Sequence, residues 1–305
     1  MPVRSAAARM KIALALALIR LLSWLPLRLV YGLAVIPGGL AYLLPWRKHR
    51  VIETNLDIAF PELNAAQRRR LHRQNLVEMM RLVLESGAAW YWSARRLERH
   101  LASPIGWDEV EKARREGRGV LLIGAHLGNW ELSSLVTSLK GPFCGLYKPP
   151  RDAAVDEALT RSRERFTGRL IATGSPAMRG LLRELKSGGT VGLLMDQLPR
   201  QGEGVYAPLF GRPALTLTLV NRLARRTGCQ VFFVTVERLS MGRGWQLRCA
   251  PVPATVGSAD SVAAAGAINA QLEAAIRRVP AQYLWLYKRF ALPPEGYDDP
   301  YKKAA

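Results

Sequence analysis

The sequence predicts an α/β fold, with helices flanking a sheet and an apolar N-terminal membrane segment in front of it. Three observations predict this arrangement. Short apolar strands alternate with helical patterns through the middle of the chain. The start of the chain is strongly apolar. Finally, 44 Lys and Arg against 24 Asp and Glu give the 305 residues a net charge of +20, which predicts an anionic partner: a nucleic acid, a membrane surface or an acidic protein.

The composition excludes several classes of protein. With 49% apolar residues the chain can bury the core of one large domain or two small ones, so it is neither disordered nor collagen-like. The three cysteines, Cys144, Cys229 and Cys249, form no CxxC pair and are too few for a disulfide framework. A reducing compartment therefore fits this chain best.

An apolar run over residues 12–46 indicates membrane association. It is broken only by Arg20 and Arg28, and basic residues close it. Its charge-free part, residues 29–46, has the 18 residues of a short spanning helix, but Pro37-Gly38-Gly39 lies in its middle. Three interpretations remain: a tilted spanning helix, two short helices dipping into one leaflet, or a cleaved signal peptide, which the lack of a cleavage site disfavours. A buried helix pair without lipid contact is the structural alternative.

These features divide the chain into a membrane-associated segment, residues 1–50, and one folded domain, residues 51–305. Cations flank the apolar run at both ends, and the positive-inside rule then favours a cytoplasmic location for the basic body. No repeat or low-complexity linker divides residues 51–305 further.

A long helix is predicted to begin at Asn64. Asn64 and Gln67 have the spacing of a capping box, and an apolar stripe over residues 71–83 lies opposite a run of arginines. We expect this helix to end near Gly87. The aromatic and basic residues over 90–99 are typical of a helix that meets lipid headgroups, and a solvated charged face explains the same residues.

The middle of the chain alternates strands with helices. The predicted strands are 120–124, 143–147, 170–172, 190–195, 231–236 and 245–249. The predicted helices are 130–139, 156–166, 178–185 and 261–278. This alternation predicts a layered α/β structure with parallel strand pairing.

Candidate catalytic residues follow the first strong strand, in Gly124-Ala125-His126-Leu127-Gly128-Asn129-Trp130-Glu131. Ligands of α/β sheets bind beyond the carboxyl ends of the strands, so His126 lies where a working residue is expected. We expect Gly128 to permit a turn that brings Glu131 beneath the imidazole. Glu131 then orients the ring, and the other ring nitrogen takes a proton from an alcohol. A structural histidine at a strand–helix junction is the alternative.

Other chemistries lack their sequence motifs. The four histidines, at positions 49, 72, 100 and 126, have no metal-binding spacing, which argues against a zinc site. No GxSxG, Walker or GxGxxG motif follows a strand. A base without a protein nucleophile predicts direct transfer onto a substrate hydroxyl, and we expect neither a metal nor a cofactor.

These residues resemble the lipid A late acyltransferases of Gram-negative bacteria, which are related to the glycerolipid acyltransferases. Residues 124–131 are similar to that family's HX4(D/E) motif. Three further blocks in the family's order are Asn55-Leu56-Asp57-Ile58-Ala59-Phe60-Pro61-Glu62-Leu63, Met195-Asp196-Gln197 with Pro208-Leu209-Phe210-Gly211-Arg212-Pro213-Ala214, and Gln282-Tyr283-Leu284-Trp285-Leu286-Tyr287-Lys288-Arg289-Phe290. In the last block Tyr287 and Lys288 stand where the family often has His and Arg.

The resemblance implies a mixed sheet of the glycerolipid acyltransferase type. It also implies an O-acyltransferase anchored at the cytoplasmic face of the bacterial inner membrane. Such an enzyme moves a fatty acyl chain from an acyl carrier protein thioester to a hydroxyl of a lipid A precursor of the Kdo-lipid IVA type. The acidic carrier, the phosphorylated glycolipid acceptor and the membrane suit a chain of charge +20, and nucleic acid is not expected as a partner.

The resemblance also implies roles for individual residues. His126 is the general base and Glu131 its partner. Arg163 binds phosphate or stabilises an oxyanion, unless the register of the motif shifts this role to Arg161. Asp196 is expected to orient an arginine. The structural alternatives are a solvated cation for Arg163 and a turn cap for Asp196.

Two other functions fit parts of the pattern. The first is the same chemistry on another membrane acceptor, such as a phosphatidylinositol mannoside or an aminolipid. The second is a non-enzymatic basic protein that binds anionic lipid or nucleic acid through its arginine clusters, which leaves the ordered blocks unexplained.

Overall fold

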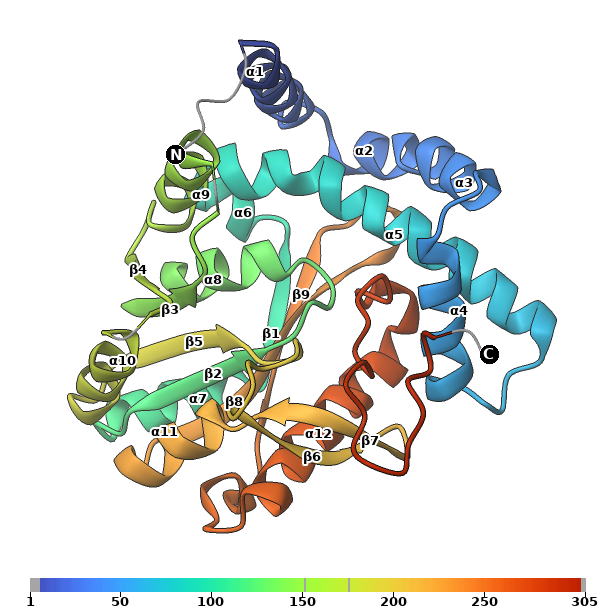
Figure 1. Ribbon diagram of the computed structural model, residues 1–305. Coiled ribbons are helices and arrows are strands. Elements are labelled where there is room, and N and C mark those ends of the chain that lie inside the picture. Colours follow the sequence, from blue (N-terminus) through green and yellow to red (C-terminus); the bar gives the residue numbers. More distant parts are fainter. Residues whose placement is uncertain (1–5, 151, 175, 303–305) are drawn as a thin grey trace.

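The computed structural model describes residues 6–150, 152–174 and 176–302, and helices lie on both sides of its central sheet (Figure 1). Within these residues seven strands form the main sheet, in the order β1-β9-β8-β2-β5-β3-β4, and two form a separate hairpin. The strands are β1 (Leu101–Ile105), β2 (Val120–Gly124), β3 (Phe143–Tyr147), β4 (Gly168–Ala172), β5 (Thr190–Leu194), β6 (Gly204–Leu209), β7 (Arg212–Leu217), β8 (Gln230–Arg238) and β9 (Trp245–Pro251).

Helices precede the sheet, alternate with its strands and follow it. The α-helices are α1 (Ala6–Leu22), α2 (Leu27–Leu33), α3 (Val35–Leu43), α4 (Lys48–Ala59), α5 (Ala65–Tyr91), α6 (Ala94–Glu98), α7 (Trp107–Arg115), α8 (Trp130–Leu139), α9 (Ala153–Arg163), α10 (Ala177–Lys186), α11 (Leu219–Thr227) and α12 (Ser261–Arg278). Short 3-10 helices are η1 (Ser240–Gly242), η2 (Ala254–Gly257) and η3 (Pro280–Gln282).

The main sheet is mixed and mostly parallel. β2 lies parallel to β5 and β8, β3 lies parallel to β4 and β5, and β1 lies parallel to β9. β8 and β9 run antiparallel, so the edge formed by β9 and β1 reverses the direction of the sheet. The α/β class and the parallel pairing predicted from the alternating pattern are therefore confirmed.

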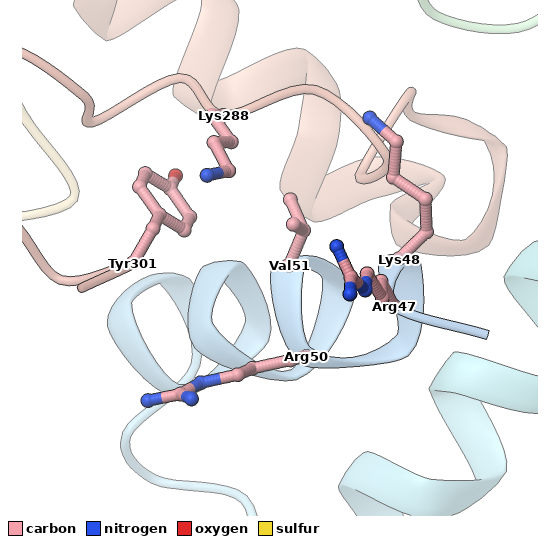
Figure 2. Close-up of a pocket in the computed structure, with 6 residues that line it drawn as sticks. All are labelled: Arg47, Lys48, Arg50, Val51, Lys288 and Tyr301. Atoms are coloured by element: carbon pink, nitrogen blue, oxygen red, sulfur yellow. The ribbon is translucent and has the colours of Figure 1, made fainter. Parts of the chain in front are cut away.

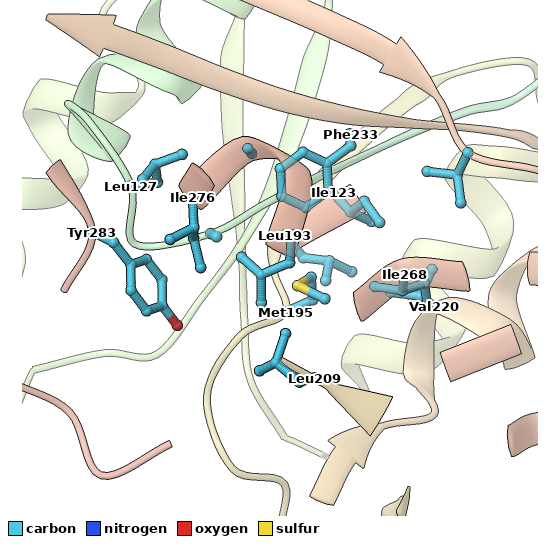
Figure 3. Packing of buried hydrophobic residues seen from close by; sticks show 14 of the residues in the cluster. Ile123, Leu127, Leu193, Met195, Leu209, Val220, Phe233, Ile268, Ile276 and Tyr283 are labelled. Carbon is cyan, nitrogen blue, oxygen red and sulfur yellow. The ribbon is translucent and has the colours of Figure 1, made fainter. Parts of the chain in front are cut away.

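Alternate residues of the central strands face two apolar layers. Leu121 and Ile123 of β2 belong to the core that includes α10, α11 and α12, whereas Val120 and Leu122 belong to the core that includes α7 and α8. Figure 3 shows Ile123 within the first of these cores. Because successive side chains of a strand point to opposite faces, a strand covered on both faces must be apolar throughout. This burial explains the continuous apolar run of β2.

The apolar N-terminal run forms three helices, α1, α2 and α3, each in contact with α5. Among the described residues no single helix has both the length and the apolar character to cross a membrane. The residues Leu27–Leu43 together with Lys48–Ala59 pass that test only as a pair bent by 95°.

A large apolar surface nevertheless remains exposed on these helices and the loops beside them. Its members are Met10, Leu14, Leu18, Leu21, Trp24, Leu29, Leu33, Val35, Ile36, Leu40, Leu43, Leu44 and Trp46. We call this set the apolar face. Large apolar side chains exposed on consecutive helices are typical of a site that contacts a partner or a membrane.

The prediction for the helix after Asn64 was right at its start and wrong at its end. Both bonds of the capping box are present: Gln67 N donates to Asn64 Oδ1 (2.9 Å) and Asn64 N donates to Gln67 Oε1 (2.8 Å). The helix continues through Gly87 to Tyr91. A Cβ atom on Gly87 would lie 2.4 Å from the Ile19 carbonyl oxygen, so this glycine permits the close contact between α1 and α5 instead of ending the helix.

Candidate active site

The register of the sheet brings His126 and Asp196 together. β2 and β5 are parallel neighbours, with Gly124 paired to Leu194 at their carboxyl ends, and Met195 N donates to Gly124 O (3.0 Å) one residue further on. His126 and Asp196 each lie two residues beyond the paired strand ends. Because both residues lie the same distance beyond the paired residues Gly124 and Leu194, their side chains are next to each other at the carboxyl edge of the sheet.

His126 and Asp196 are joined by two hydrogen bonds. His126 Nδ1 lies 2.8 Å from Asp196 Oδ1, and the His126 backbone N donates to Asp196 Oδ2 at 3.0 Å. Because an ionised carboxylate only accepts, the Nδ1 atom carries the hydrogen and the Nε2 atom of the neutral ring has a free lone pair. Asp196 has 3% of its side-chain surface exposed and His126 has 17%, so the histidine is the member of the pair that solvent reaches.

The free ring nitrogen faces a replaceable partner. Gln197 Nε2 lies 3.3 Å from His126 Nε2, a position from which the amide N–H donates to the free lone pair. Gln197 is exposed, so a substrate hydroxyl can take its place. The Trp130 ring packs against the imidazole in an edge-to-face arrangement, with centroids 5.2 Å apart. The arrangement has the geometry of a general base held by a carboxylate.

The pair shifts the pKa of both its members. Burial acts to lower the pKa of His126, but the charge and hydrogen bond of Asp196 outweigh it, and the pKa of His126 is raised above 6.5. Burial acts to raise the pKa of Asp196, but the His126 charge and the hydrogen bonds to its ring and backbone outweigh it and lower that pKa. Asp196 therefore makes His126 a stronger base.

The expected pairing of Glu131 with His126 is wrong. Glu131 binds Arg163 instead: Arg163 Nη2 lies 2.7 Å and 2.9 Å from the two carboxylate oxygens, and Arg163 Nε lies 3.2 Å from one of them. Glu131 lies in the first turn of α8 and Arg163 is the last residue of α9, so the side chain of Glu131 reaches the neighbouring helix. Its charge still contributes, as the smaller carboxylate effect, to the raised pKa of His126.

The contacts of Arg161 and Asp196 bear on two further expectations. Arg161 pairs with Glu157 one helical turn away at the surface and is 76% exposed, which assigns the contact with Glu131 to Arg163. Asp196 was expected to orient Arg163 or Arg212, but it hydrogen-bonds to His126 because the sheet places β5 beside β2.

Backbone hydrogen bonds hold the loop that carries His126 against β8 and against the C-terminal segment. Gly128 adopts φ +64°, and a Cβ atom there would lie 2.2 Å from the Val236 carbonyl oxygen. Asn129 N donates to Val236 O (2.7 Å), and Gly128 N donates to Gln282 O (3.1 Å). The predicted glycine turn is therefore confirmed, and it fixes the loop against β8 and the C-terminal segment.

A buried charged network lies behind the same loop. Arg238 Nη2 donates to the Gly128 carbonyl oxygen (3.0 Å), and the arginine also pairs with Glu85 and with Glu78 (3.4 Å) of α5. Glu85 accepts hydrogen bonds from Tyr31 Oη (2.7 Å) and from Trp245 Nε1 (3.2 Å). Burial raises the pKa of Glu85, against the lowering effects of Arg238 and these donors.

This network was not predicted from the sequence, although the sequence contains a sign of it. Glu78 and Glu85 are seven residues apart on α5, which is about two helical turns. They lie on the helix face whose other residues, such as Leu71, Met79 and Leu82, are buried in the core. Two acidic residues on an apolar helix face predict a buried cation opposite them.

The sequence blocks far apart in the chain meet around the site. Asn55 Nδ2 donates to the carbonyl oxygens of Trp285 (2.7 Å) and Tyr287 (2.9 Å). Leu198 N donates to the Tyr287 hydroxyl (2.9 Å), so the tyrosine that departs from the resembled pattern holds the chain just after Gln197. Within the described residues no group of three or more His, Cys, Asp or Glu side chains is placed to hold a metal ion.

Comparison with known proteins identifies the family. The sequence profile of the family described as bacterial lipid A biosynthesis acyltransferase matches residues 4–291. The chain belongs to this family. Among its relatives, the lipid A biosynthesis lauroyltransferase of Escherichia coli K12 is 30% identical over 279 residues, which cover 91% of this chain and 90% of the relative.

Two further relatives cover similar shares. The lipid A biosynthesis palmitoleoyltransferase of Escherichia coli K12 is 28% identical over 260 residues, 85% of this chain and 84% of the relative. A lipid A biosynthesis acyltransferase of Haemophilus influenzae is 25% identical over 256 residues, 82% of this chain and 79% of the relative. The resemblance seen in the sequence blocks is thereby confirmed, and the chain is an acyltransferase by family.

Proposed function

We propose that this acyltransferase moves a fatty acyl chain from an acyl carrier protein thioester to a hydroxyl of a lipid A precursor of the Kdo-lipid IVA type, with His126 as the general base. The hydrogen bond from His126 Nδ1 to the buried Asp196 carboxylate carries the proposal, because it leaves the Nε2 lone pair facing an exposed position. Family membership supports the reaction class.

The proposed reaction is one acyl transfer without an acyl-enzyme. His126 Nε2 takes the proton of the acceptor hydroxyl as the hydroxyl oxygen attacks the thioester carbonyl. The C–S bond then breaks, the acyl chain stays on the acceptor oxygen as an ester, and the thiolate of the carrier takes the proton back from the imidazolium. Asp196 holds the ring in the required tautomer and stabilises its positive charge in between.

We assign Arg163 to the charge that develops on the acyl donor or to an acceptor phosphate. Glu131 engages Nε and Nη2 of Arg163, and within the described residues Nη1 makes no hydrogen bond to the protein. A guanidinium held by a carboxylate on one edge still offers donors on another. In this proposal Glu131 is a positioning residue that acts through Arg163.

We further propose that the apolar face docks on the cytoplasmic surface of the bacterial inner membrane. Its large apolar side chains are exposed on the helices and loops before α4, and Arg20, Arg28, Arg47 and Arg50 lie among or beside them. Apolar side chains flanked by cations favour an anionic membrane surface. The charge of +20 also attracts an acidic carrier protein.

A direct assay tests the proposed function. Purified full-length protein is mixed with a labelled acyl carrier protein thioester and the lipid A precursor, and the product is analysed by mass spectrometry. The expected product is heavier by one acyl group in an ester, and folded His126→Ala protein forms far less of it. Transfer only to a phosphatidylinositol mannoside or an aminolipid contradicts the proposed acceptor, and wild-type turnover in His126→Ala removes the base from the mechanism.

A further inference from the structure

A cavity of about 190 Å³ lies between the beginning of α4 and the C-terminal segment (Figure 2). Its lining residues are Arg47, Lys48, Arg50, Val51, Lys288 and Tyr301. We call it the basic pocket. Four of its six lining residues are cations, and they come from two segments more than two hundred residues apart in the sequence.

Within the part of the chain that the structure describes, the cations of the basic pocket have no carboxylate partner. Among the described residues none of the four forms an ion pair: Lys48 Nζ donates to the Leu286 carbonyl oxygen (3.2 Å), and Lys288 Nζ lies 5.5 Å from the centre of the Tyr301 ring. The carboxylates of α4 face a different element, because Asp57 pairs with Arg68 of α5 (2.9 Å) and Glu53 lies 3.8 Å from His72 of α5. Among the described residues no carboxylate therefore pairs with these four cations, and the carboxylate beside the pocket, Asp299, accepts a hydrogen bond from Tyr301 N (2.9 Å).

The backbone adds to this charge. α4 has no acidic residue in its first turn, and no side chain caps its N-terminus. The N-terminus of a helix carries a partial positive charge that ordinarily attracts acidic side chains. Here the first turn carries Lys48 and Arg50 and follows Arg47, so three cations lie at the end of the helix that repels them, with the Arg50 side chain pointing away from Lys288 (Figure 2). An anion in the cavity relieves this repulsion.

A phosphate monoester suits the pocket better than a carboxylate. It carries a charge of about −1.5 to −2 and three strong acceptor oxygens. That charge neutralises two of the surrounding cations, and the oxygens can accept from arginine and lysine at once. A carboxylate brings a single charge and leaves most of the repulsion in place.

The position of the pocket connects it to a lipid. Leu43 and Leu44 of the apolar face lie four to five residues before the start of α4 at Lys48, and Leu43 is 77% exposed. Docking of the apolar face on a bilayer brings the basic pocket to the level of the headgroups, where cations beside apolar side chains meet phosphates.

The pocket also connects to the candidate active site. Leu284 N donates to the His126 carbonyl oxygen (2.9 Å), and Lys288 lies four residues further along the same segment. Four residues span at most about 14 Å when fully extended. A phosphorylated glycolipid headgroup can therefore occupy the pocket with its phosphate while one of its hydroxyls reaches His126.

We propose that the basic pocket binds a phosphate monoester on the headgroup of the membrane-embedded acceptor and so selects the hydroxyl that His126 deprotonates. This assignment rests on the proposed function, in which the acceptor is a phosphorylated glycolipid. It adds the subsite that recognises the phosphate.

Vesicle binding by full-length protein tests the pocket without any reaction. Phosphatidylcholine vesicles carry either phosphatidic acid, a monoester, or phosphatidylglycerol, a diester, at equal surface charge, and binding is measured by flotation. We expect the wild type to prefer phosphatidic acid. The variant Arg50→Gln/Lys288→Gln should lose that preference, with binding to phosphatidic acid weaker by about fivefold or more because two of the four cations that line the pocket are gone.

The control variant Arg225→Gln/Arg226→Gln removes the same charge from exposed positions of α11, which lies on another side of the molecule (Figure 1). It should keep the preference for the monoester. The variant Arg50→Lys/Lys288→Arg keeps the charge in the pocket and should keep most of the binding. Equal losses in the pocket and control variants, or equal losses for both lipids, overturn the proposal.

Inorganic phosphate separates a lipid headgroup from a free ion. At constant ionic strength it should displace the protein from phosphatidic acid vesicles only at high concentration, since it brings no apolar contact. Tight binding of inorganic phosphate to the basic pocket, with no preference between the two lipids, overturns the assignment to a lipid.

A kinetic comparison separates failure of the subsite from failure of the proposed function. With phosphorylated acceptor, Arg50→Gln/Lys288→Gln should raise the acceptor KM by about tenfold and leave the donor KM equal to that of the control variant. A protein that transfers no acyl chain to any glycolipid contradicts the proposed function, and the vesicle result then still decides whether the pocket binds phosphate. An unchanged acceptor KM in an active enzyme overturns the subsite alone.

Discussion

Two charged groups flank the loop that carries His126, and they differ in what they leave open. On one side, His126 and Asp196 form a pair whose ring nitrogen Nε2 meets only an exposed amide. On the other side, Arg238 is 2% exposed and joins Glu85, Glu78 and the Gly128 carbonyl oxygen. Both groups bury charge, but only the first keeps a reactive atom within reach of a substrate.

The difference shows how one kind of interaction can serve chemistry or structure. A buried ion pair whose donors and acceptors are all engaged cannot exchange a proton with a ligand, but it fixes the groups around it. The Arg238 network thereby holds the backbone of the loop, and the loop presents the imidazole. The comparison predicts that substitutions on the His126 side lower the rate of a stable protein, and that substitutions on the Arg238 side lower the stability.

The largest effect is expected at the base. His126→Ala should lower turnover by about 10²- to 10⁴-fold, the usual range for general base catalysis, because the variant lacks the imidazole that we propose as the base. Thermal unfolding checks that the variant is folded. The contact between His126 and Asp196 suggests a double variant. His126→Ala/Asp196→Ala should be little slower than His126→Ala alone, since the two residues act as one unit. Additive losses contradict that unit.

The second effect is expected in the network. Glu85→Gln keeps the size of the side chain but leaves the buried Arg238 with Glu78 alone, and the free energy of unfolding should fall by about 3–5 kcal/mol. Denaturant unfolding in a fixed detergent measures the loss. The matched control is Glu157→Gln, which breaks the exposed pair with Arg161 and should leave stability nearly unchanged. Equal stability in the two variants refutes a structural role for the network.

The third effect concerns the pH dependence of the rate. A general base acts in its neutral form, so on the proposed mechanism turnover should rise with pH as His126 loses its proton, with a midpoint above 6.5 because Asp196 raises that pKa. Asp196→Asn removes the charge, and the midpoint should move down by about one pH unit on the residual activity. A pH–rate profile of both proteins measures the shift. An unchanged midpoint in Asp196→Asn would mean that Asp196 does not set the pKa of the group whose titration controls turnover.

The same pair shapes stability with pH. The folded pKa of His126 is raised from 6.5, so its contribution is complete below pH 6.5 and is lost as the pH rises through the folded value. The folded pKa of Asp196 is lowered from 3.8, so its contribution is complete above pH 3.8 and is lost as the pH falls through the folded value. Wild type should therefore exceed Asp196→Asn in stability most between pH 3.8 and 6.5.

Local patterns predicted most of the central fold. β2, β3, α8 and α12 have the predicted bounds because apolar runs of clear period define them. β1 and the hairpin of β6 and β7 were not predicted, and each contains prolines: Pro104 in β1, Pro208 in β6 and Pro213 in β7. Proline is tolerated in edge strands and two-stranded ribbons, where a missing N–H costs no ladder bond, but in a sequence it argues against a strand.

The members of the candidate site were predicted, but their pairing was not. His126, Glu131, Arg163 and Asp196 were all selected, with Glu131 assigned to His126 because the two are close in sequence. Strand order decides otherwise: β2 neighbours β5 instead of β3, which follows it in the chain, and this order brings Asp196 to the imidazole. Pairing between strands seventy residues apart depends on packing across the whole sheet, which no local pattern records.

The smallest of the four effects is expected at Arg163, and it tests whether the second carboxylate pair belongs to the site. Arg163→Lys keeps the charge but loses the planar fork that holds Glu131 through two nitrogens, so turnover should fall by about tenfold. The matched control, Arg161→Lys in the exposed pair with Glu157, should behave as wild type. Vesicle binding should not change in either variant, because the net charge is the same.

A second variant tests whether Glu131 acts through the arginine. If it does, Glu131→Gln should lower turnover by the same factor as Arg163→Lys, and the double variant Arg163→Lys/Glu131→Gln should be little slower than either single variant. Normal turnover in Arg163→Lys returns this pair to a structural role, and the chemistry then depends on His126 and Asp196 alone.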